Sequence, residues 1–307
     1  MGKKDARAVL VLYKYCPYFR NFVGVCFDLV LMLRQLQCFS TNRGRRMKRT
    51  LMHQIPNEMP QDIRHFISGA NIYDSSCSPE ARVYFIDKGN GYYLKCSGIG
   101  KLEKEAKMTE YFYSKGLGAK VLSYSSNDCD WLLTTAVSGE VCVHEEYLRN
   151  PKRLCDTIAY ELRKLHEIDY TDCPIADRTA EYLAGAEKNY HTGNYDKSQF
   201  PDSFGYRSAK GAYDILIAEK DALQSKVLLH GDYCLPNIIF DNWKFSGFID
   251  VGNGGVGDRH IDLFWGVWTL WFNLKTNKYQ ERFLDAYGRD KADETALKIV
   301  AAAEVFG

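Results

Sequence analysis

Residues 228–240 read Leu-Leu-His-Gly-Asp-Tyr-Cys-Leu-Pro-Asn-Ile-Ile-Phe, and no other stretch of the chain is as informative. An apolar run leads into the His-Gly-Asp turn, Asn237 stands five positions after Asp232, and a second apolar run follows. Residues 247–252 then read Gly-Phe-Ile-Asp-Val-Gly, so that Asp250 ends another apolar run. The two carboxylates therefore follow apolar segments that have the character of buried strands, and the amide directly precedes another such segment.

These three side chains are the set that phosphoryl transfer from a nucleotide needs. One carboxylate accepts the proton of the attacking hydroxyl, and a second carboxylate together with an amide oxygen holds Mg²⁺. Mg²⁺ prefers hard oxygen ligands and usually takes only one or two carboxylates along with the phosphates. The spacing matches a kinase catalytic loop and its D-x-G metal loop. Either motif alone is an ordinary turn, but their order and context predict a kinase-type site.

The expected local structure supports this prediction. Residues 227–229 are short and aliphatic, as in a buried strand. Residues 238–240 and 245–249 flank the polar pair Asp241-Asn242, which predicts a hairpin. That hairpin would bring the two aspartates and the asparagine together at one end.

A cation for the nucleotide phosphates is expected on an earlier hairpin. Residues 81–87 read as a strand, residues 88–91 form a Lys-Gly-Asn-Gly turn, and residues 92–96 form the return strand that carries Lys95. Residues 101–113 have helical composition and include Glu105. A strand lysine paired with a glutamate of the next helix is the kinase arrangement for clamping phosphates. The alternative, a solvated strand lysine, is disfavoured because the downstream loops are present.

No G-x-G-x-x-G precedes the lysine strand. Residues 74–80 read Asp-Ser-Ser-Cys-Ser-Pro-Glu at that place, and a loop of small hydroxyl residues can still offer donors to phosphate oxygens. This departure points away from protein kinases and towards kinases of small molecules.

The chain resembles the aminoglycoside phosphotransferases, most closely the 3'-phosphotransferases, from roughly residue 54 to the C-terminus. The resemblance implies an α+β, two-lobed protein-kinase-like fold, with a small antiparallel-sheet N-lobe and a larger, mainly helical C-lobe. The matching elements are Ser78-Pro79 with Arg82-Val83-Tyr84, Tyr93-Leu94-Lys95, the helix with Glu105, Leu133-Thr134-Thr135-Ala136, His230 to Asn237, Ile249 to Gly252, and Gly257 to Leu263.

The resemblance also implies residue roles. Asp232 is the expected catalytic base, and Asn237 and Asp250 are the expected Mg²⁺ ligands. Lys95, held by Glu105, is expected on the α- and β-phosphates. Further roles follow as a set: Tyr93 on the adenine face, Thr134 and Ala136 on its edge, Ser78 at the phosphates, Asp202, Glu304 and Phe306 at the acceptor, and His230 and Asp262 behind the catalytic loop.

The implied activity is transfer of the γ-phosphate of ATP, or of GTP, to a hydroxyl of an aminoglycoside antibiotic, with the 3'-hydroxyl expected and antibiotic resistance as the consequence. Three departures bear on the acceptor. Residues 188–202, in the expected antibiotic-facing insert, hold only two acids, the C-terminus has one acid fewer than the family's, and Asn253 replaces a common arginine. Aminoglycosides are polycations that carboxylates bind. A kinase of another small hydroxylated metabolite or antibiotic, and a non-catalytic nucleotide-binding module, therefore stay open.

Charge and cysteine content indicate which partners and which cellular location to expect. A net charge of +1 at pH 7 gives no reason to expect a nucleic-acid partner. The ten cysteines include no C-x-x-C pair and lack disulfide or zinc spacing, which favours a reducing, cytoplasmic location. We expect a monomer or weak dimer without a stable membrane span.

The domain division follows from the motifs. We expect a nucleotide-binding N-lobe over residues 47–136 and a catalytic, substrate-binding C-lobe over residues 137–307. Residues 1–46 form an N-terminal extension in which the apolar run 22–33 is too short for the ~20 residues of a span. A membrane-anchoring arm, a signal-like segment and an upstream extension outside the working protein are all compatible with it; we favour the last.

Overall fold

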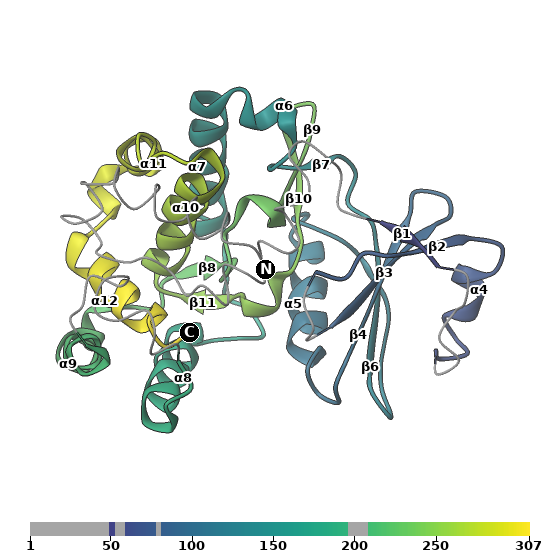
Figure 1. Cartoon of the computed structure of the whole chain (residues 1–307), viewed down its shortest axis with the longest axis horizontal. Coiled ribbons are helices and arrows are strands. Elements are labelled where there is room, and N and C mark those ends of the chain that lie inside the picture. Colours follow the sequence, from purple (N-terminus) through teal and green to yellow (C-terminus); the bar gives the residue numbers. More distant parts are fainter. Residues whose placement is uncertain (1–48, 53–58, 78–80, 196–207) are drawn as a thin grey trace, which may run out of the picture.

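The computed structural model describes residues 49–52, 59–77, 81–195 and 208–307, and everything below refers to these ranges. They form the expected α+β molecule of two lobes, one built around an antiparallel sheet and the other mainly helical (Figure 1). The expected N-terminal extension, residues 1–46, lies outside the described residues.

The small lobe is a six-stranded sheet with the order β1-β2-β3-β4-β6-β5, in which every neighbouring pair is antiparallel. The predicted hairpin is confirmed, since β3 pairs with β4 from Arg82↔Cys96 to Ile86↔Tyr92. The positive φ angles of its turn are at Gly89 (60°) and Gly91 (88°). The elements of this lobe are β1 (Thr50–Leu51), α4 (Arg64–Ile67), β2 (Asn71–Asp74), β3 (Arg82–Asp87), β4 (Tyr92–Ser97), α5 (Glu103–Ser114), β5 (Val121–Ser126) and β6 (Asp130–Thr135).

Helix α5 joins the two lobes. Its Ala106 packs with Leu132 of the sheet, whereas Met108 and Phe112 are buried in the core of the large lobe. In Figure 1, α5 lies between the sheet and the helical lobe. A residue on this helix is therefore held by both lobes at once.

The large lobe packs its helices around one apolar core. Helix α7 is part of this core, since its Leu154, Ile158, Leu162 and Leu165 are all buried. Trp265 and Trp268 of α10 are also buried in this core. The helices are α6 (Glu145–Leu148), α7 (Pro151–His166), α8 (Arg178–Thr192), α9 (Ala209–Glu219), α10 (Arg259–Leu274), α11 (Gln280–Tyr287) and α12 (Glu294–Glu304).

Two small sheets in this lobe carry the motif loops, with orders β10-β9-β7 and β11-β8. Their strands are β7 (Glu140–Val141), β8 (Val227–Leu229), β9 (Ile238–Asp241), β10 (Lys244–Phe248) and β11 (Gly255–Gly257). Short 3₁₀ helices η2 (Lys220–Ala222), η3 (Leu235–Asn237), η4 (Val251–Asn253) and η5 (Arg289–Lys291) complete the lobe.

The second predicted hairpin forms as β9–β10, but its turn is one residue later than expected. Asp241 pairs with Lys244, so Asn242 and Trp243 form the turn, with φ values of 50° and 66°. Positive φ is unusual for tryptophan. Tertiary packing accounts for it, because the Trp243 ring meets Tyr147 edge-on at 4.9 Å and lies under Arg153 at 4.2 Å.

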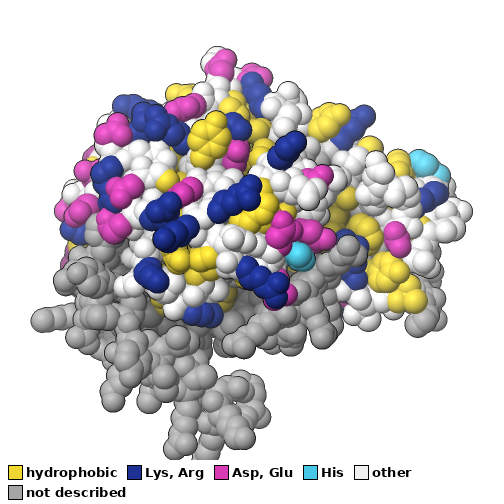
Figure 2. Space-filling view, turned by 90° about the horizontal axis from the view of Figure 1, so that it is seen from above, with side chains coloured by type: hydrophobic (Ala, Val, Ile, Leu, Met, Phe, Trp, Pro, Cys, Tyr) yellow, Lys and Arg dark blue, Asp and Glu magenta, His cyan; other side chains and the backbone are white. Residues whose placement is uncertain are grey.

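The surface carries no field of a single sign on the face drawn in Figure 2, where basic and acidic side chains are interspersed. This agrees with the net charge of +1. Within the described ranges, none of the helices has both the length and the apolar character needed to cross a bilayer.

Candidate active site

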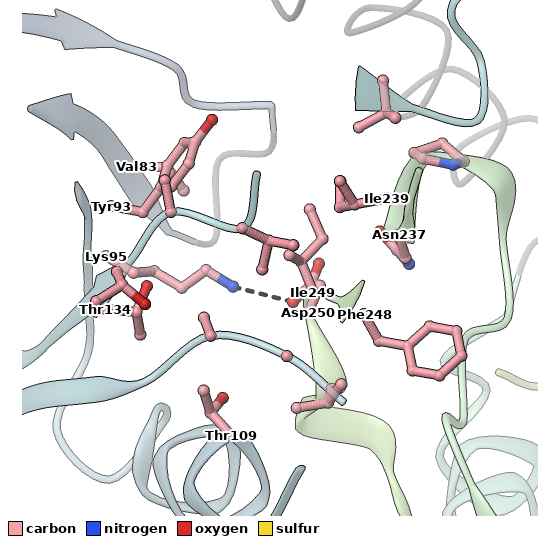
Figure 3. Close-up of a pocket in the computed structure, with 18 of the residues that line it drawn as sticks. Val83, Tyr93, Lys95, Thr109, Thr134, Asn237, Ile239, Phe248, Ile249 and Asp250 are labelled. Carbon is pink, nitrogen blue, oxygen red and sulfur yellow. Dashed lines mark hydrogen bonds and ion pairs between the residues drawn. The ribbon is translucent and has the colours of Figure 1, made fainter. Parts of the chain in front are cut away.

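A cavity of about 730 Å³ lies between the lobes, and residues of both lobes line it. Lys95 comes from the small lobe, and Asp232, Asn237 and Asp250 come from the motif loops of the large lobe. Figure 3 shows the Lys95 side chain pointing across the cavity towards Asp250. Residues that are 155 positions apart in sequence thus converge on one space.

The ammonium of Lys95 is shared by two carboxylates. Nζ donates to Glu105 Oε1 at 2.7 Å and to Asp250 Oδ1 at 3.0 Å. Its side chain is only 19% exposed, so burial opposes the charge. The two carboxylates outweigh that effect and raise the pKa of Lys95 above its ordinary value. Lys95 is therefore a fixed cation at neutral pH.

Glu105 is held in place by the metal loop behind it. A Cβ placed on Gly252 would lie 3.2 Å from the Cβ of Glu105, so α5 and the D-x-G turn are in close contact. Burial raises the pKa of the Glu105 carboxyl, while the neighbouring Lys95 opposes that shift. Only a small residue at position 252 permits this approach.

Asp250 adopts a conformation that is uncommon for a residue with a side chain. Its φ and ψ are 59° and 48°, in the left-handed region. Aspartate tolerates this region better than most residues do, and such strain concentrates at functional sites. Its side chain is 54% exposed, and Lys95 lowers the pKa of its carboxyl. The turn thus holds a carboxylate that stays ionised and faces the cavity.

Asp232 has one carboxylate oxygen bound and the other available. Asn237 Nδ2 donates to Asp232 Oδ2 at 2.9 Å and to its backbone carbonyl at 3.0 Å. In the described structure Oδ1 of Asp232 is buried and has no hydrogen-bond partner. Burial raises the pKa of this carboxyl. A buried acceptor without a partner, in a cavity, is suited to receive a hydroxyl proton from a bound molecule.

The backbone of the catalytic loop is held by Asp262 of α10. Its carboxylate accepts from the N–H groups of His230 at 2.7 Å and Gly231 at 2.8 Å, and it is fully buried. His230 in turn connects the two motif loops, since Nε2 lies 3.1 Å from the Ile249 carbonyl and Nδ1 accepts from the Asp232 N–H at 3.3 Å. Both residues are where sequence reasoning expected support for the loop.

A second layer behind Asp262 was not predicted from the sequence. His166 Nε2 lies 3.2 Å from the Asp262 carboxylate, and Nδ1 lies 2.8 Å from the Tyr287 hydroxyl. Burial lowers the pKa of His166, so the neutral ring donates from Nε2 and accepts at Nδ1. Arg259 donates to the Tyr287 hydroxyl at 3.3 Å. No spacing in the sequence links residues 166 and 287, and no signal could have revealed this pair.

The glycine of the His-Gly-Asp turn is required by contact with the other motif loop. Gly231 has φ of 82°, and a Cβ there would lie 1.9 Å from the Asn253 carbonyl oxygen. No real Cβ tolerates that distance. The catalytic loop and the D-x-G loop are therefore packed backbone against backbone at Gly231.

The expected adenine-binding residues are among those that line the cavity. Tyr93, Thr134 and Ala136 all contribute to its wall. However, the Ala136 N–H donates to the Gly91 carbonyl at 3.0 Å and is used within the sheet. The next lining residue is Val137, whose N–H has no acceptor among the described residues. The structure thus offers Val137 as the backbone donor of this segment.

Ser75 lines the cavity, and although it belongs to the expected loop of hydroxyl residues, it was not singled out from the sequence. Its hydroxyl is buried and lacks a hydrogen-bond partner among the described residues. The Ser75 N–H donates to the Val83 carbonyl at 2.8 Å, which fixes the start of the loop. The cluster of hydroxyl residues after β2 was the available signal, but it pointed to Ser78. Ser78 itself lies outside the described residues.

Glu304 and Phe306, two of the expected acceptor residues, are not among the residues that line this cavity. Glu304 is buried, accepts from the Tyr182 hydroxyl at 2.8 Å, and has its pKa raised by burial to about 7. Phe306 is fully buried, with its ring 5.4 Å from that of Tyr190. Asp202 lies outside the described residues. The acceptor roles of these three residues remain predictions.

Comparison with known proteins places this site in a family. The model of the phosphotransferase enzyme family matches residues 79–299. A probable aminoglycoside 3'-phosphotransferase of Lactococcus lactis is 51% identical over 251 residues, which cover 81% of this chain and 95% of the relative. An aminoglycoside 3'-phosphotransferase of Escherichia coli is 30% identical over 75% of this chain and 84% of its own length.

Solved structures show the same fold. The crystal structure of an aminoglycoside 3'-phosphotransferase of type VIII superimposes with a TM-score of 0.65 at 21% identity, covering 89% of this chain and 99% of the other. A Streptomyces rimosus aminoglycoside phosphotransferase in complex with ADP and streptomycin gives 0.59 at 23% identity, covering 74% and 91%. Because the family model spans most of the chain and the L. lactis relative is matched almost end to end, this protein belongs to the aminoglycoside phosphotransferase family of phosphotransferase enzymes.

Proposed function

We propose that this enzyme transfers the γ-phosphate of ATP to the 3'-hydroxyl of an aminoglycoside antibiotic and thereby confers resistance. The observation that carries the proposal is the convergence of the Lys95–Glu105–Asp250 ion cluster and the unpartnered Asp232 carboxylate oxygen in one cavity. The relatives that match over most of this chain are named for this activity.

The proton of the acceptor hydroxyl passes to Asp232. Oδ1 is the oxygen left free once Asn237 has bound Oδ2, and its raised pKa brings it closer to neutral pH. General-base catalysis of this kind contributes typically 10²–10⁴-fold to the rate. The hydroxyl oxygen then attacks the γ-phosphorus and the bond to the ADP oxygen breaks.

The phosphates are neutralised by Lys95, whose charge is maintained by its two carboxylate partners. The remaining donors suit Mg²⁺. The ionised Asp250 carboxylate faces the cavity, and Asn237, whose nitrogen is turned to Asp232, has its amide oxygen left for a cation. When bound, Mg²⁺ would neutralise charge on the transferred group.

The base of the nucleotide would lie between Tyr93 and the segment from Thr134 to Val137, with Val137 N–H as the edge donor in place of Ala136. Ser78 and the free Ser75 hydroxyl would contact phosphate oxygens. We expect ATP to be preferred and GTP to be the second donor to test. Because this donor is an intracellular metabolite, the enzyme would act in the cytoplasm.

Acceptor contacts are assigned to Asp202, Glu304 and Phe306, since a polycation needs carboxylates near its ring hydroxyls. An ionised Glu304 would supply one of them, and its pKa of about 7 allows a bound cation to drive that ionisation.

A matched pair of acceptors tests the proposal. Purified enzyme is incubated with ATP or GTP and Mg²⁺, and either an aminoglycoside that has a 3'-hydroxyl or its 3'-deoxy analogue. We expect ADP release and a mass gain of one phosphoryl group only with the first. Transfer to the 3'-deoxy analogue as well would move the site of phosphorylation to another hydroxyl.

A panel of other hydroxyl compounds decides between the alternatives. Transfer to a metabolite alcohol but to no aminoglycoside would identify a different small-molecule kinase. Nucleotide binding without transfer to any hydroxyl would identify a non-catalytic module. Resistance is checked by expressing the chain in a susceptible bacterium and measuring the inhibitory antibiotic concentration.

A further inference from the structure

The first turn of α8 is anchored to the large lobe on two sides. Asp177, at the N-cap, accepts from the Ala180 N–H at 3.0 Å and from the Ser225 hydroxyl at 2.7 Å. Thr179 is buried and its hydroxyl accepts from the Asp258 N–H at 2.8 Å. The residue between them, Arg178, therefore starts from a backbone that cannot shift freely.

Arg178 reaches from this turn to the end of the D-x-G loop. Its Nε donates to the carbonyl oxygen of Asn253 at 2.8 Å. This is the same oxygen that lies against Gly231, where a Cβ would come within 1.9 Å. The charged Arg178 side chain thus fixes the Asn253 carbonyl, and the catalytic loop packs against this carbonyl at Gly231, the residue before Asp232. Hydrogen bonds with a charged donor are stronger than neutral ones.

The same arginine is connected to the helix that carries Glu105. Arg178 Nη1 lies 3.9 Å from the Glu181 carboxylate, one turn further along α8. Glu181 also forms an ion pair with Lys104 of α5. Lys104 is the immediate neighbour of Glu105, which binds Lys95. A continuous chain of polar contacts therefore runs from the small-lobe helix to the junction of the two motif loops.

Arg178 also lies near the buried carboxylate of α12. Its guanidinium carbon is 5.9 Å from the centre of the Tyr182 ring, and the Tyr182 hydroxyl donates to Glu304 at 2.8 Å. The positive charge of Arg178 favours ionisation of Glu304 and so counteracts part of the effect of its burial on the pKa. The arginine is thus within electrostatic reach of a group assigned to the acceptor.

We propose that Arg178 is a positioning residue for phosphoryl transfer: it fixes the Asn253 carbonyl and, through Glu181 and Lys104, sets the catalytic loop relative to the Glu105 helix. The inference rests on the proposed function of the Asp232 and Asp250 loops. Arg178 touches neither nucleotide nor acceptor in this scheme. Its effect is therefore on kcat, because it keeps Asp232 and the phosphates at reacting distance.

The test compares Arg178→Gln with Arg282→Gln in the full chain. Arg282 pairs with Asp156 on the surface, away from the cavity, so its variant controls for loss of an arginine and an ion pair. We expect kcat of Arg178→Gln to fall about 10- to 100-fold, since small misplacements of reacting groups have effects of that size. KM for ATP should stay within about twofold, because ground-state binding is retained. Arg178→Lys keeps a charged donor and should recover part of the lost kcat.

A kcat of Arg178→Gln within about twofold of wild type would overturn the inference. The inference would also be overturned if a lower thermal unfolding midpoint of Arg178→Gln accounted for its whole loss of activity and if Arg178→Lys recovered none of the lost kcat. If Arg178→Gln does not fold, Arg178→Lys is measured instead. We then expect its kcat to lie below that of wild type, and a kcat equal to that of wild type would overturn the inference.

Failure of the proposed function is a separate outcome. It would appear as a wild-type enzyme that phosphorylates no aminoglycoside. In that case the aminoglycoside assay is replaced by an assay of ADP release. The acceptor in that assay is water or whichever hydroxyl compound the enzyme phosphorylates. The ratio of variant to wild-type kcat then still decides the role of Arg178.

Discussion

At the scale of single residues, Asp250 shows that a sequence motif can predict a side chain's role but not its backbone conformation. The D-x-G pattern identified a carboxylate for the phosphate site. The pattern did not reveal that this aspartate adopts a φ of 59°, because a sequence motif specifies residue types and not their backbone angles. The effects of the backbone strain and of the negative charge at position 250 can be measured separately, because asparagine also tolerates the left-handed region but carries no charge.

We predict that Asp250→Asn keeps the turn intact but loses Mg²⁺-dependent nucleotide binding. The loss in metal affinity should be at least about 10- to 100-fold, the effect of removing even a partner of a metal ligand. Calorimetric titration with a non-hydrolysable ATP analogue, with and without Mg²⁺, measures it. Asp241→Asn, at an exposed position, is the matched control. Equal Mg²⁺ dependence in Asp250→Asn and wild type would exclude Asp250 as a ligand.

At the scale of elements, the site depends on how closely the two motif loops approach each other. Hairpin β3–β4 and helix α5 could be predicted because turn residues and helical composition are local properties of the sequence. The turn of β9–β10 was off by one residue because Trp243 packs onto Tyr147. The contact between His166 and Tyr287 also could not be predicted, because these two residues meet only in the folded chain.

Gly231 gives the element-scale prediction. In Gly231→Ala the new Cβ would meet the Asn253 carbonyl at 1.9 Å, so the loops must separate. Gly100→Ala is the control, because Gly100 has φ of 74° but nothing within 4 Å of a Cβ. Both variants carry the backbone strain of alanine at positive φ, on the order of 1 kcal/mol or more. Only Gly231→Ala should also lose kcat.

Unfolding by urea and steady-state kinetics on the same samples separate the two effects. If Gly231→Ala and Gly100→Ala have the same kcat, the contact between the motif loops does not set the position of Asp232.

At the scale of the whole molecule, the two-lobed arrangement was predicted through the resemblance to the aminoglycoside phosphotransferases, which rests on motifs found in both lobes. The boundary at residue 136 and the monomeric or weakly dimeric state stay predictions. What the sequence could not supply is the environment of Glu304, because its burial and its hydrogen bond with Tyr182 arise only in the folded chain.

Stability should depend on pH through Glu304. Its pKa is about 7 in the folded protein against an ordinary value of 4.5 for a solvated glutamate, so between these values the folded state binds more protons than the unfolded chain. The stabilisation from this protonated group is therefore complete below pH 4.5 and is lost as the pH rises through 7. At about 1.4 kcal/mol per pKa unit, the effect is roughly 3.5 kcal/mol.

We predict that Glu304→Gln reduces this loss of unfolding free energy between pH 4.5 and 7.5, because the amide does not ionise. Some slope should remain, since burial also raises the pKa of Asp232. Urea unfolding at several pH values measures it, with the exposed Glu110→Gln as control. The same pH dependence in Glu304→Gln and wild type would mean that Glu304 is not the group responsible.

In the proposed reaction, Asp232 accepts a proton from a hydroxyl while Lys95 and the metal loop hold the phosphates. The most direct measurement is phosphate transfer from labelled ATP to an aminoglycoside by Asp232→Ala, alongside its affinity for the nucleotide, with the exposed Asp214→Ala as control. We predict that Asp232→Ala binds nucleotide as wild type does but transfers phosphate about 10²–10⁴-fold more slowly, while Asp214→Ala is unaffected. Transfer by Asp232→Ala at the wild-type rate would contradict the account.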